Sequence, residues 1–242
     1  MTPPRLQEIR RERLRWPGPS DRTAIVGRTG SGKTQAALWH LSRSDFDARP
    51  WIILDYKNEE LVAAIGRAIP IEFEDGVPEE PGIYVLKVFP GDDDAENISD
   101  FFYDVWAWED VGIVIDEGYM IDPRDKWFNA CLTQGRSKQI SMLILSQRPV
   151  WLSRFVFSEA SFFQVFDLTH AKDMDKVREY LRDDDRQLLD RELPDYCSFF
   201  YDVGRRRLEV LGPVPDAGSI LRVIDQRLLE QELLRNPQPR AI

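Results

Sequence analysis

The stretch IVGRTGSGKT, residues 25–34, decides the fold of this chain. Residues 27–34 within it satisfy the pattern GxxxxGK[ST]. The apolar run RTAIVG at 22–27 predicts a buried strand before this motif, and a helical segment follows it. Glycines let successive backbone N–H groups converge on phosphate oxygens at a helix N-terminus. The sequence therefore predicts a phosphate-binding loop inside an α/β domain.

The two residues that end the motif have specific expected tasks. Lys33 is expected to reach the β- and γ-phosphates of a nucleotide, and Thr34 to ligate Mg²⁺ through its hydroxyl. The expected cofactors are therefore ATP and Mg²⁺. The predicted nucleotide-binding residues are Gly27, Arg28, Thr29, Gly30, Ser31, Gly32, Lys33, Thr34 and Gln35.

The stretch IVIDE at 113–117 predicts the second part of the site, because it is a buried strand that ends in two carboxylates. Asp116 is expected to hold Mg²⁺ through its water shell. Glu117 is expected to orient or deprotonate the attacking water. Such a water-activating glutamate is more typical of hydrolases that move polymers than of small-molecule kinases.

Short apolar runs alternate with helical segments along most of the chain, which predicts a doubly wound, mostly parallel sheet. The expected fold class is α/β, a RecA-like P-loop NTPase with a small C-terminal hairpin and a tail helix. The predicted strands are 22–27, 51–56, 82–88, 111–116, 140–146 and 162–168, and the predicted helices between them are 61–69, 98–109 and 125–136.

After residue 170 the pattern changes to a charged helical pair at 173–181 and 184–193 and a hairpin at 197–211 that turns at Gly204. An amphipathic helix is expected from about 217 to 235. We therefore expect three parts. These are a basic N-terminal arm at 1–20, an ATPase motor domain at 21–215, and a C-terminal helix and tail at 216–242, with an acidic loop at 91–100.

Composition narrows the function classes. The chain has 242 residues, 43% of them apolar, and its two cysteines form no CxxC or Cys/His cluster, so neither a disulfide framework nor a zinc site is predicted. No run approaches the ~18 apolar residues of a membrane span, and we expect a soluble, cytoplasmic protein without a direct membrane span. The net charge of −10 argues against a surface coated with basic residues for nucleic-acid binding. It does not exclude a localised group of basic residues that contacts phosphates.

Two further stretches identify a family resemblance. GRSKQISMLILSQRP at 135–149 is a strand that ends in SQRP, with an arginine eleven residues before the glutamine, and DYKNEEL at 55–61 follows the strand WIIL. Together with IVGRTGSGKT and IVIDE, in this order, they resemble the FtsK–HerA superfamily of ring-shaped DNA translocases. The resemblance covers roughly residues 22–170.

The resemblance implies roles for residues outside the phosphate loop. Gln147 corresponds to the family's sensor position, where an amide can contact the γ-phosphate or the attacking water. Arg136 corresponds to the upstream arginine and is the favoured candidate for a finger that reaches a neighbouring subunit's site, with Arg28, Arg148 and Arg154 as alternatives. Asp55 and Lys57 are expected beside the nucleotide crevice, in a supporting or intersubunit role or as a local ion pair. The predicted catalytic set is Glu117, Lys33, Gln147 and Arg136.

The absence of large extra domains makes the chain similar to the genome-packaging ATPases of tailless viruses with an internal membrane. This resemblance implies a viral double-stranded-DNA translocase, built as a ring with six subunits expected, in the host cytoplasm or the virion. Double-stranded DNA, further copies of the chain, and a capsid vertex or portal protein are the implied partners. Two alternatives remain open at this point: a plasmid-transfer or filamentous-phage assembly ATPase, and a non-motor P-loop kinase or switch.

Overall fold

The computed structural model describes residues 14–89 and 94–235, and these form a nine-stranded sheet in the order β3-β4-β2-β5-β6-β1-β7-β8-β9. The strands from β3 to β7 in this order run parallel, and β8 and β9 continue the sheet as an antiparallel hairpin. The strands are β1 (Arg22–Val26), β2 (Pro50–Asp55), β3 (Ile69–Ile71), β4 (Gly82–Lys87), β5 (Gly112–Asp116), β6 (Ser141–Ser146), β7 (Phe162–Val165), β8 (Ser198–Asp202) and β9 (Arg207–Leu211).

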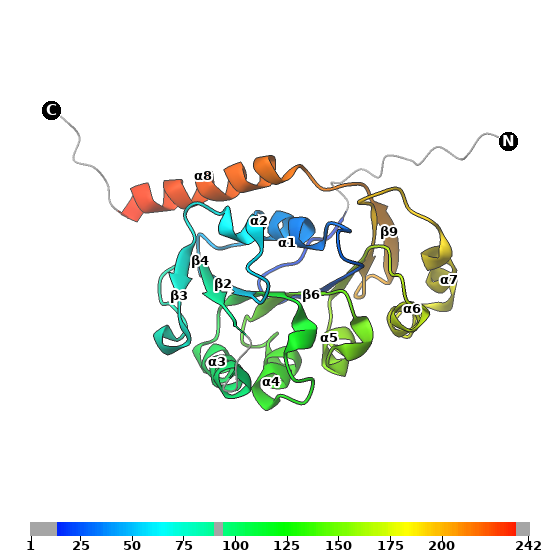
Figure 1. Ribbon diagram of the computed structural model, residues 1–242, viewed down its shortest axis with the longest axis horizontal. Helices are drawn as coiled ribbons and strands as arrows, with labels where there is room; N and C mark the ends of the chain where they lie inside the picture. The colour runs from blue at the N-terminus through cyan, green and yellow to red at the C-terminus, as the bar shows by residue number, and fades with distance from the viewer. Residues whose placement is uncertain (1–13, 90–93, 236–242) are drawn as a thin grey trace.

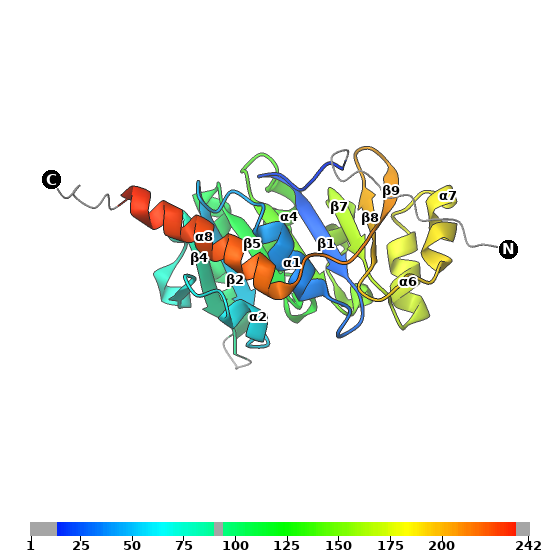
Figure 2. The ribbon, with the colours of Figure 1, turned by 90° about the horizontal axis from the view of Figure 1, so that it is seen from above.

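Helices cover both faces of the parallel part of the sheet (Figure 1). One face carries α1 and α2, with the long α8 lying across them (Figure 2), and the other face carries α3, α4 and α5. The helices are α1 (Lys33–Leu41), α2 (Glu60–Ala63), α3 (Asp94–Trp108), α4 (Lys126–Gln134), α5 (Arg154–Ser158), α6 (Ala171–Arg178), α7 (Asp183–Arg186) and α8 (Ala217–Arg235), with 3₁₀ turns at Phe73–Asp75, Gly118–Met120, Pro149–Trp151 and Gln187–Asp190.

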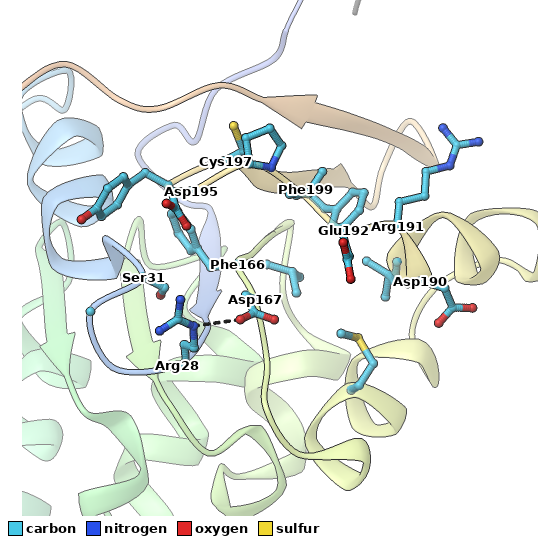
Figure 3. Close-up of a pocket in the computed structure, with 17 residues that line it drawn as sticks. Arg28, Ser31, Phe166, Asp167, Asp190, Arg191, Glu192, Asp195, Cys197 and Phe199 are labelled. Atoms are coloured by element: carbon cyan, nitrogen blue, oxygen red, sulfur yellow. Dashed lines mark hydrogen bonds and ion pairs between the residues drawn. The ribbon is translucent and has the colours of Figure 1, made fainter. Parts of the chain in front are cut away.

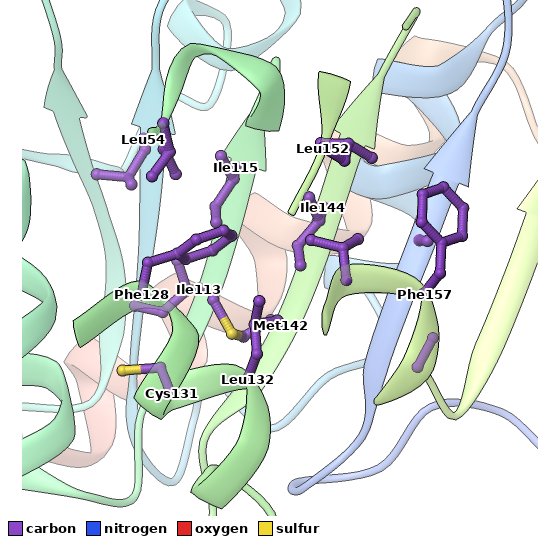
Figure 4. Packing of buried hydrophobic residues seen from close by; sticks show 14 of the residues in the cluster. Leu54, Ile113, Ile115, Phe128, Cys131, Leu132, Met142, Ile144, Leu152 and Phe157 are labelled. Carbon is purple, nitrogen blue, oxygen red and sulfur yellow. The ribbon is translucent and has the colours of Figure 1, made fainter. Parts of the chain in front are cut away.

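The central strands are apolar on both faces, as parallel strands between two helical layers must be. Successive residues of β5 alternate between the two layers: Ile113 and Ile115 pack in the cluster with α3, α4 and α5, and Val114 packs in the cluster with α1 and α8. Figure 4 shows the first of these clusters, where Phe128 of α4 covers β5. This packing fixes where each strand ends, and so fixes the geometry of the site.

The predicted fold class is confirmed, but the structure differs from the expected elements between β2 and β4. The helix expected at 61–69 ends at Ala63, and Ile69 already belongs to a strand, β3, that the sequence reasoning missed. Pro70 explains the difference, because proline disfavours helical geometry in the residue before it. Gly66 weakens helix formation further.

Other differences are at the edges of the predicted elements. The acidic loop expected at 91–100 is wrong in its second half, because α3 begins at Asp94, and residues 91–93 lie outside the described part. Residues 1–13 of the basic arm and 236–242 of the tail also lie outside it. Of the arm's described end, Leu14 and Trp16 pack against Phe162 and Phe200 of the sheet.

The predicted hairpin is confirmed, with β8 and β9 joined by a turn that contains Gly204. The left-handed residue of that turn is Arg206, at φ 53°, and not the glycine. Among the helices of the described residues, none combines the length and the apolar character that crossing a membrane requires.

Candidate active site

The site lies at the carboxyl ends of four adjacent strands, β2, β5, β6 and β1. The phosphate loop joins β1 to α1, and Lys33 is the first residue of the helix. Gly30 and Gly32 have φ values of +76° and +97°, a conformation that side chains rarely adopt, so glycine is needed at both positions. The loop is also fixed from outside, because Arg28 N–H donates to the Asp167 carbonyl at 2.7 Å.

Lys33 is buried beneath this loop, and its Nζ donates to the Arg28 carbonyl at 3.0 Å. The pKa of Lys33 is lowered to about 8, chiefly by burial and next by the positive charge of Lys57, against a smaller opposing effect of Asp116. A phosphate group in the loop would supply negative charge to this poorly hydrated ammonium. The burial and the lowered pKa of Lys33 are therefore consistent with the expected contact between its ammonium and a phosphate.

Asp116 ends β5 and is buried, and burial raises its pKa to about 6 although Lys57 acts in the opposite direction. Its Oδ2 atom has no hydrogen-bond partner among the described residues. Mg²⁺ keeps several waters and takes one or two carboxylates plus substrate phosphates. A buried carboxylate oxygen without a protein donor, with Thr34 in the first turn of α1, fits such an ion. Below about pH 6 the carboxylate would be protonated and would lose this capacity.

Glu117 follows directly, with its side chain 1% exposed and its backbone in the left-handed region at φ 67°. Its Oε1 is paired with the Lys57 ammonium, and its Oε2 has no hydrogen-bond partner among the described residues. Asp55 pairs in register with Asp116 across β2 and β5. Asp55 and Lys57 thus lie beside the crevice, but the Lys57 ammonium pairs with Glu117, sixty residues away in the sequence, so its ion pair is not a local one.

Gln147 follows β6, between the phosphate loop and the two carboxylates. Its Oε1 accepts a hydrogen bond from the Thr29 hydroxyl at 2.5 Å, and its Nε2 donates to the Tyr119 hydroxyl at 3.3 Å. The amide thus connects the phosphate loop to the turn after β5. Sequence reasoning did not find Tyr119, because its link to Gln147 depends on β5 and β6 being neighbours.

On the other side of the phosphate loop is a cavity of about 710 Å³, between the loop and segment 189–197 (Figure 3). The Arg28 guanidinium pairs with the Asp167 carboxylate at 2.8 Å in its wall. Tyr196 lies so close to Gly32 that a Cβ there would meet the ring at 3.3 Å. This cavity was not predicted, because segment 189–197 reaches the loop only through the β7–β8 pairing.

Two other predicted residues lie away from this centre. Arg136 follows α4 and precedes β6. This places it at the amino-terminal ends of the parallel strands, on the opposite side of the sheet's length from the phosphate loop, which lies at their carboxyl ends. There it adds to the lowering of the Arg22 pKa, which burial causes in the first place. Gln35 donates to the Pro215 carbonyl at 2.7 Å, so its amide faces the segment before α8.

The fold and the site together are those of a P-loop nucleotide-binding protein of the α/β class. Among solved structures, the chain is similar to the genome packaging NTPase B204 of Sulfolobus turreted icosahedral virus 2 in complex with ATP-gammaS. The TM-score is 0.65 at 18% identity, over 81% of this chain and 99% of that one. VirB4 of Thermoanaerobacter pseudethanolicus is also similar, with a TM-score of 0.59 at 12% identity, over 81% of this chain and 89% of that one. No protein-family profile matches the chain.

Sequence comparison narrows the class. The chain is 41% identical over 220 residues to the DNA packaging ATPase P9 of Enterobacteria phage PRD1, which covers 88% of this chain and 95% of P9. The chain therefore belongs to the family of phage DNA-packaging ATPases that includes P9. The expected resemblance to viral genome-packaging ATPases is thereby confirmed.

Proposed function

We propose that this ATPase hydrolyses ATP to move double-stranded DNA into a viral particle. The observation that carries the proposal is the placement of Glu117 beside Asp116 and one strand from Gln147, in a chain 41% identical to a DNA packaging ATPase. A nucleotide switch or a kinase does not need both a water-activating glutamate and a polar sensor. The likeness to VirB4 is one of fold alone, so the plasmid-transfer alternative gains no separate support.

The proposed nucleotide position follows from the two halves of the site. The phosphates would lie on residues 27–34, and the nucleoside would extend into the cavity toward Tyr196 and segment 189–197. Lys33 would pair with the β- and γ-phosphates. Mg²⁺, held by Thr34 and through water by Asp116, would neutralise charge on the phosphates.

Glu117 would act as the general base that orients and deprotonates the attacking water, a role worth typically 10²–10⁴ in rate. Gln147 would sense the γ-phosphate, because its amide already bridges Thr29 and Tyr119. Any change at the phosphate loop would thereby reach the turn at Gly118–Met120. These roles give the two polar residues different tasks: Glu117 acts on water and Gln147 reports on the phosphate.

Arg136 is proposed to act on a neighbouring subunit and not on its own chain, since it lies at the sheet edge opposite its own phosphate loop. A head-to-tail ring joins unlike surfaces of successive subunits. A ring, with six subunits expected, would therefore bring the amino-terminal ends of the strands of one copy to the carboxyl ends of the strands of the next. A trans arginine stabilises charge on the transferred phosphate.

The proposed partners are double-stranded DNA in the ring's pore, further copies of the chain, and a capsid vertex or portal protein, in the host cytoplasm and the virion. A ring reconciles the net charge of −10 with DNA binding. A few basic side chains facing the pore are multiplied by the number of subunits, and phosphate contacts supply most of sequence-independent affinity.

The ring proposal is tested by mixing two inactive variants in the presence of duplex DNA. Arg136→Ala should lower kcat by about 10³–10⁵-fold, and Lys33→Ala should also be inactive. Mixtures should partly regain ATPase activity, because Lys33→Ala subunits still offer Arg136 to the intact loops of Arg136→Ala subunits. Absence of any regain at every mixing ratio, with both variants folded and assembled, would remove Arg136 from the trans role. Arg124→Ala, an exposed arginine before the same helix, is the control and should keep wild-type activity.

A further inference from the structure

Helix α8 buries one side and leaves apolar side chains exposed on the other. Ile220, Ile224 and Leu228, each four residues apart, are buried in the cluster with α1. Seen from above in Figure 2, α8 lies across the domain with no other helix or strand of the described part over it. A helix that is apolar on all sides is normally buried on all sides. The apolar residues that stay exposed on α8 are Val223, Leu229, Leu233 and Leu234, at 47%, 38%, 51% and 82%.

The charges on the exposed side of α8 are self-complementary when the helix is reversed. A helical turn holds 3.6 residues, so Arg222, Gln226 and Glu230 lie near one line along this side. Arg222 and Glu230 are exposed and stand four residues before and four residues after Gln226. Helix α8 runs from Ala217 to Arg235, so Gln226 is also its midpoint. Two copies packed antiparallel about Gln226 would set Arg222 level with Glu230 of the partner subunit.

Side-chain size follows the same symmetry. Leu233 lies seven residues after Gln226, and Ser219 lies seven residues before it. An antiparallel pair of helices therefore sets a leucine against a serine at each end, and facing large and small side chains interdigitate well.

The two charged side chains have hydrogen-bonding capacity left for a partner. Arg222 donates to the Ser219 hydroxyl at 3.0 Å, and Glu230 accepts from the Gln226 amide at 2.9 Å. Both are bonds between exposed side chains of the same helix. A guanidinium has five N–H donors and a carboxylate about four acceptor sites, so neither group is used up by one such bond.

We propose that the exposed side of α8 is a self-association surface, on which a second copy of this chain packs antiparallel. Such a two-fold contact is isologous, so each pairing of residues occurs twice. The surface differs from the proposed ring contact, which uses the two ends of the parallel strands, because α8 lies over the helices on one face of the sheet (Figure 1). The pairing goes beyond the proposed function and needs no ATP, Mg²⁺ or DNA.

Sedimentation velocity of the full chain, without nucleotide, measures the pairing directly. Wild type should show a monomer–dimer equilibrium with a Kd on the order of 10 µM, because one helix pair is a small interface. A wild-type chain that stays monomeric at about 100 µM, ten times that Kd, would overturn the proposal.

Charge reversal tests the predicted pairing of residues. Arg222→Glu and Glu230→Arg should each weaken the dimer by about tenfold or more, because each reversal sets like charges together twice. The double variant restores unlike charges and should recover most of the wild-type affinity. Both residues are exposed, so the urea midpoint of unfolding should stay near the wild-type value in all three variants. A folded double variant that dimerises no better than the single variants would contradict the antiparallel pairing.

A matched control is the ion pair between Arg67 and Glu232, which joins α8 to its own domain at 2.5 Å. Arg67→Glu and Glu232→Arg change the net charge as the test variants do, and they should leave the Kd for dimerisation unchanged. Equal weakening by these control variants would show a response to net charge alone and would overturn the proposal. Loss of the dimer in Arg136→Ala but not in Arg222→Glu would place the contact at the strand ends and overturn it also.

Discussion

Lys33→Ala is expected to abolish ATP turnover, with a loss of at least about 10²–10³-fold in kcat, the scale of removing one preorganised charge donor from a site. The reason is the position of its ammonium, which is buried under the phosphate loop and donates to the Arg28 carbonyl at 3.0 Å. Removing it leaves the loop's N–H groups as the phosphate ligands that remain there. Titration calorimetry measures the binding of ATP, and a steady-state phosphate-release assay measures its turnover.

The pH dependence of ATP binding provides a second expectation for the same residue. In the free protein the pKa of Lys33 is lowered to about 8, chiefly by burial, so the side chain loses its charge above that pH. Pairing with phosphate requires the charged form, so the affinity for ATP should fall as the pH rises above about 8.

The control for Lys33→Ala is Lys172→Ala, a substitution of an exposed lysine at the start of α6, which should keep both the affinity for ATP and its turnover. Equal turnover of Lys33→Ala and wild type would refute the assigned site.

Glu117→Gln is expected to retain ATP but to lower kcat by about 10²–10⁴-fold, the usual contribution of a general base. Glutamine has the same shape as glutamate and can still fill the buried position between β5 and the 3₁₀ turn at Gly118–Met120, but it cannot take a proton. The variant should therefore trap bound ATP. Single-turnover hydrolysis with pre-bound ATP separates this chemical defect from a binding defect.

A matched control for this prediction is Glu179→Gln, whose carboxylate is exposed and pairs with Lys176 at 2.8 Å. It should hydrolyse ATP at the wild-type rate. Full turnover by Glu117→Gln would remove Glu117 from the role of base. Loss of ATP binding in that variant would instead indicate that its carboxylate supports the phosphate loop.

The parts of the site that lie within one continuous stretch were predictable from the sequence. The phosphate loop, the Asp116–Glu117 pair and the strand that ends before Gln147 each carry their own pattern of apolar residues and polar termini. Their order along the chain, with the expected parallel sheet, also placed them at one edge. The fold class followed from the same alternation of strands and helices.

The parts that were not predictable depend on which strands are neighbours. The Lys57–Glu117 ion pair exists because β2 lies beside β5, although sixty residues separate the two side chains. Tyr119 meets Gln147 for the same reason across β5 and β6. Segment 189–197 reaches the phosphate loop through the hairpin that extends the sheet beyond β7. None of these contacts has a local sequence signal.

The edge position of Arg136 shows how spacing alone can mislead about distance. The motif spacing links Arg136 to Gln147, but the whole length of β6 lies between them. Arg136 is therefore at the amino-terminal ends of the parallel strands and Gln147 at their carboxyl ends. A role in the chemistry therefore requires a second subunit. This is a stronger statement than the sequence alone allowed, because it excludes action on the phosphates of the same chain.

The most direct test of the proposed DNA translocation is displacement of a third strand from duplex DNA. A short labelled oligonucleotide is bound as a triplex at one end of a linear duplex, and its release is followed after addition of protein, ATP and Mg²⁺. We expect release by the wild-type chain that depends on ATP and on duplex length ahead of the triplex, and none by Glu117→Gln. ATP hydrolysis by the wild-type chain without any release of the third strand, under conditions where the chain binds the duplex, would contradict the account.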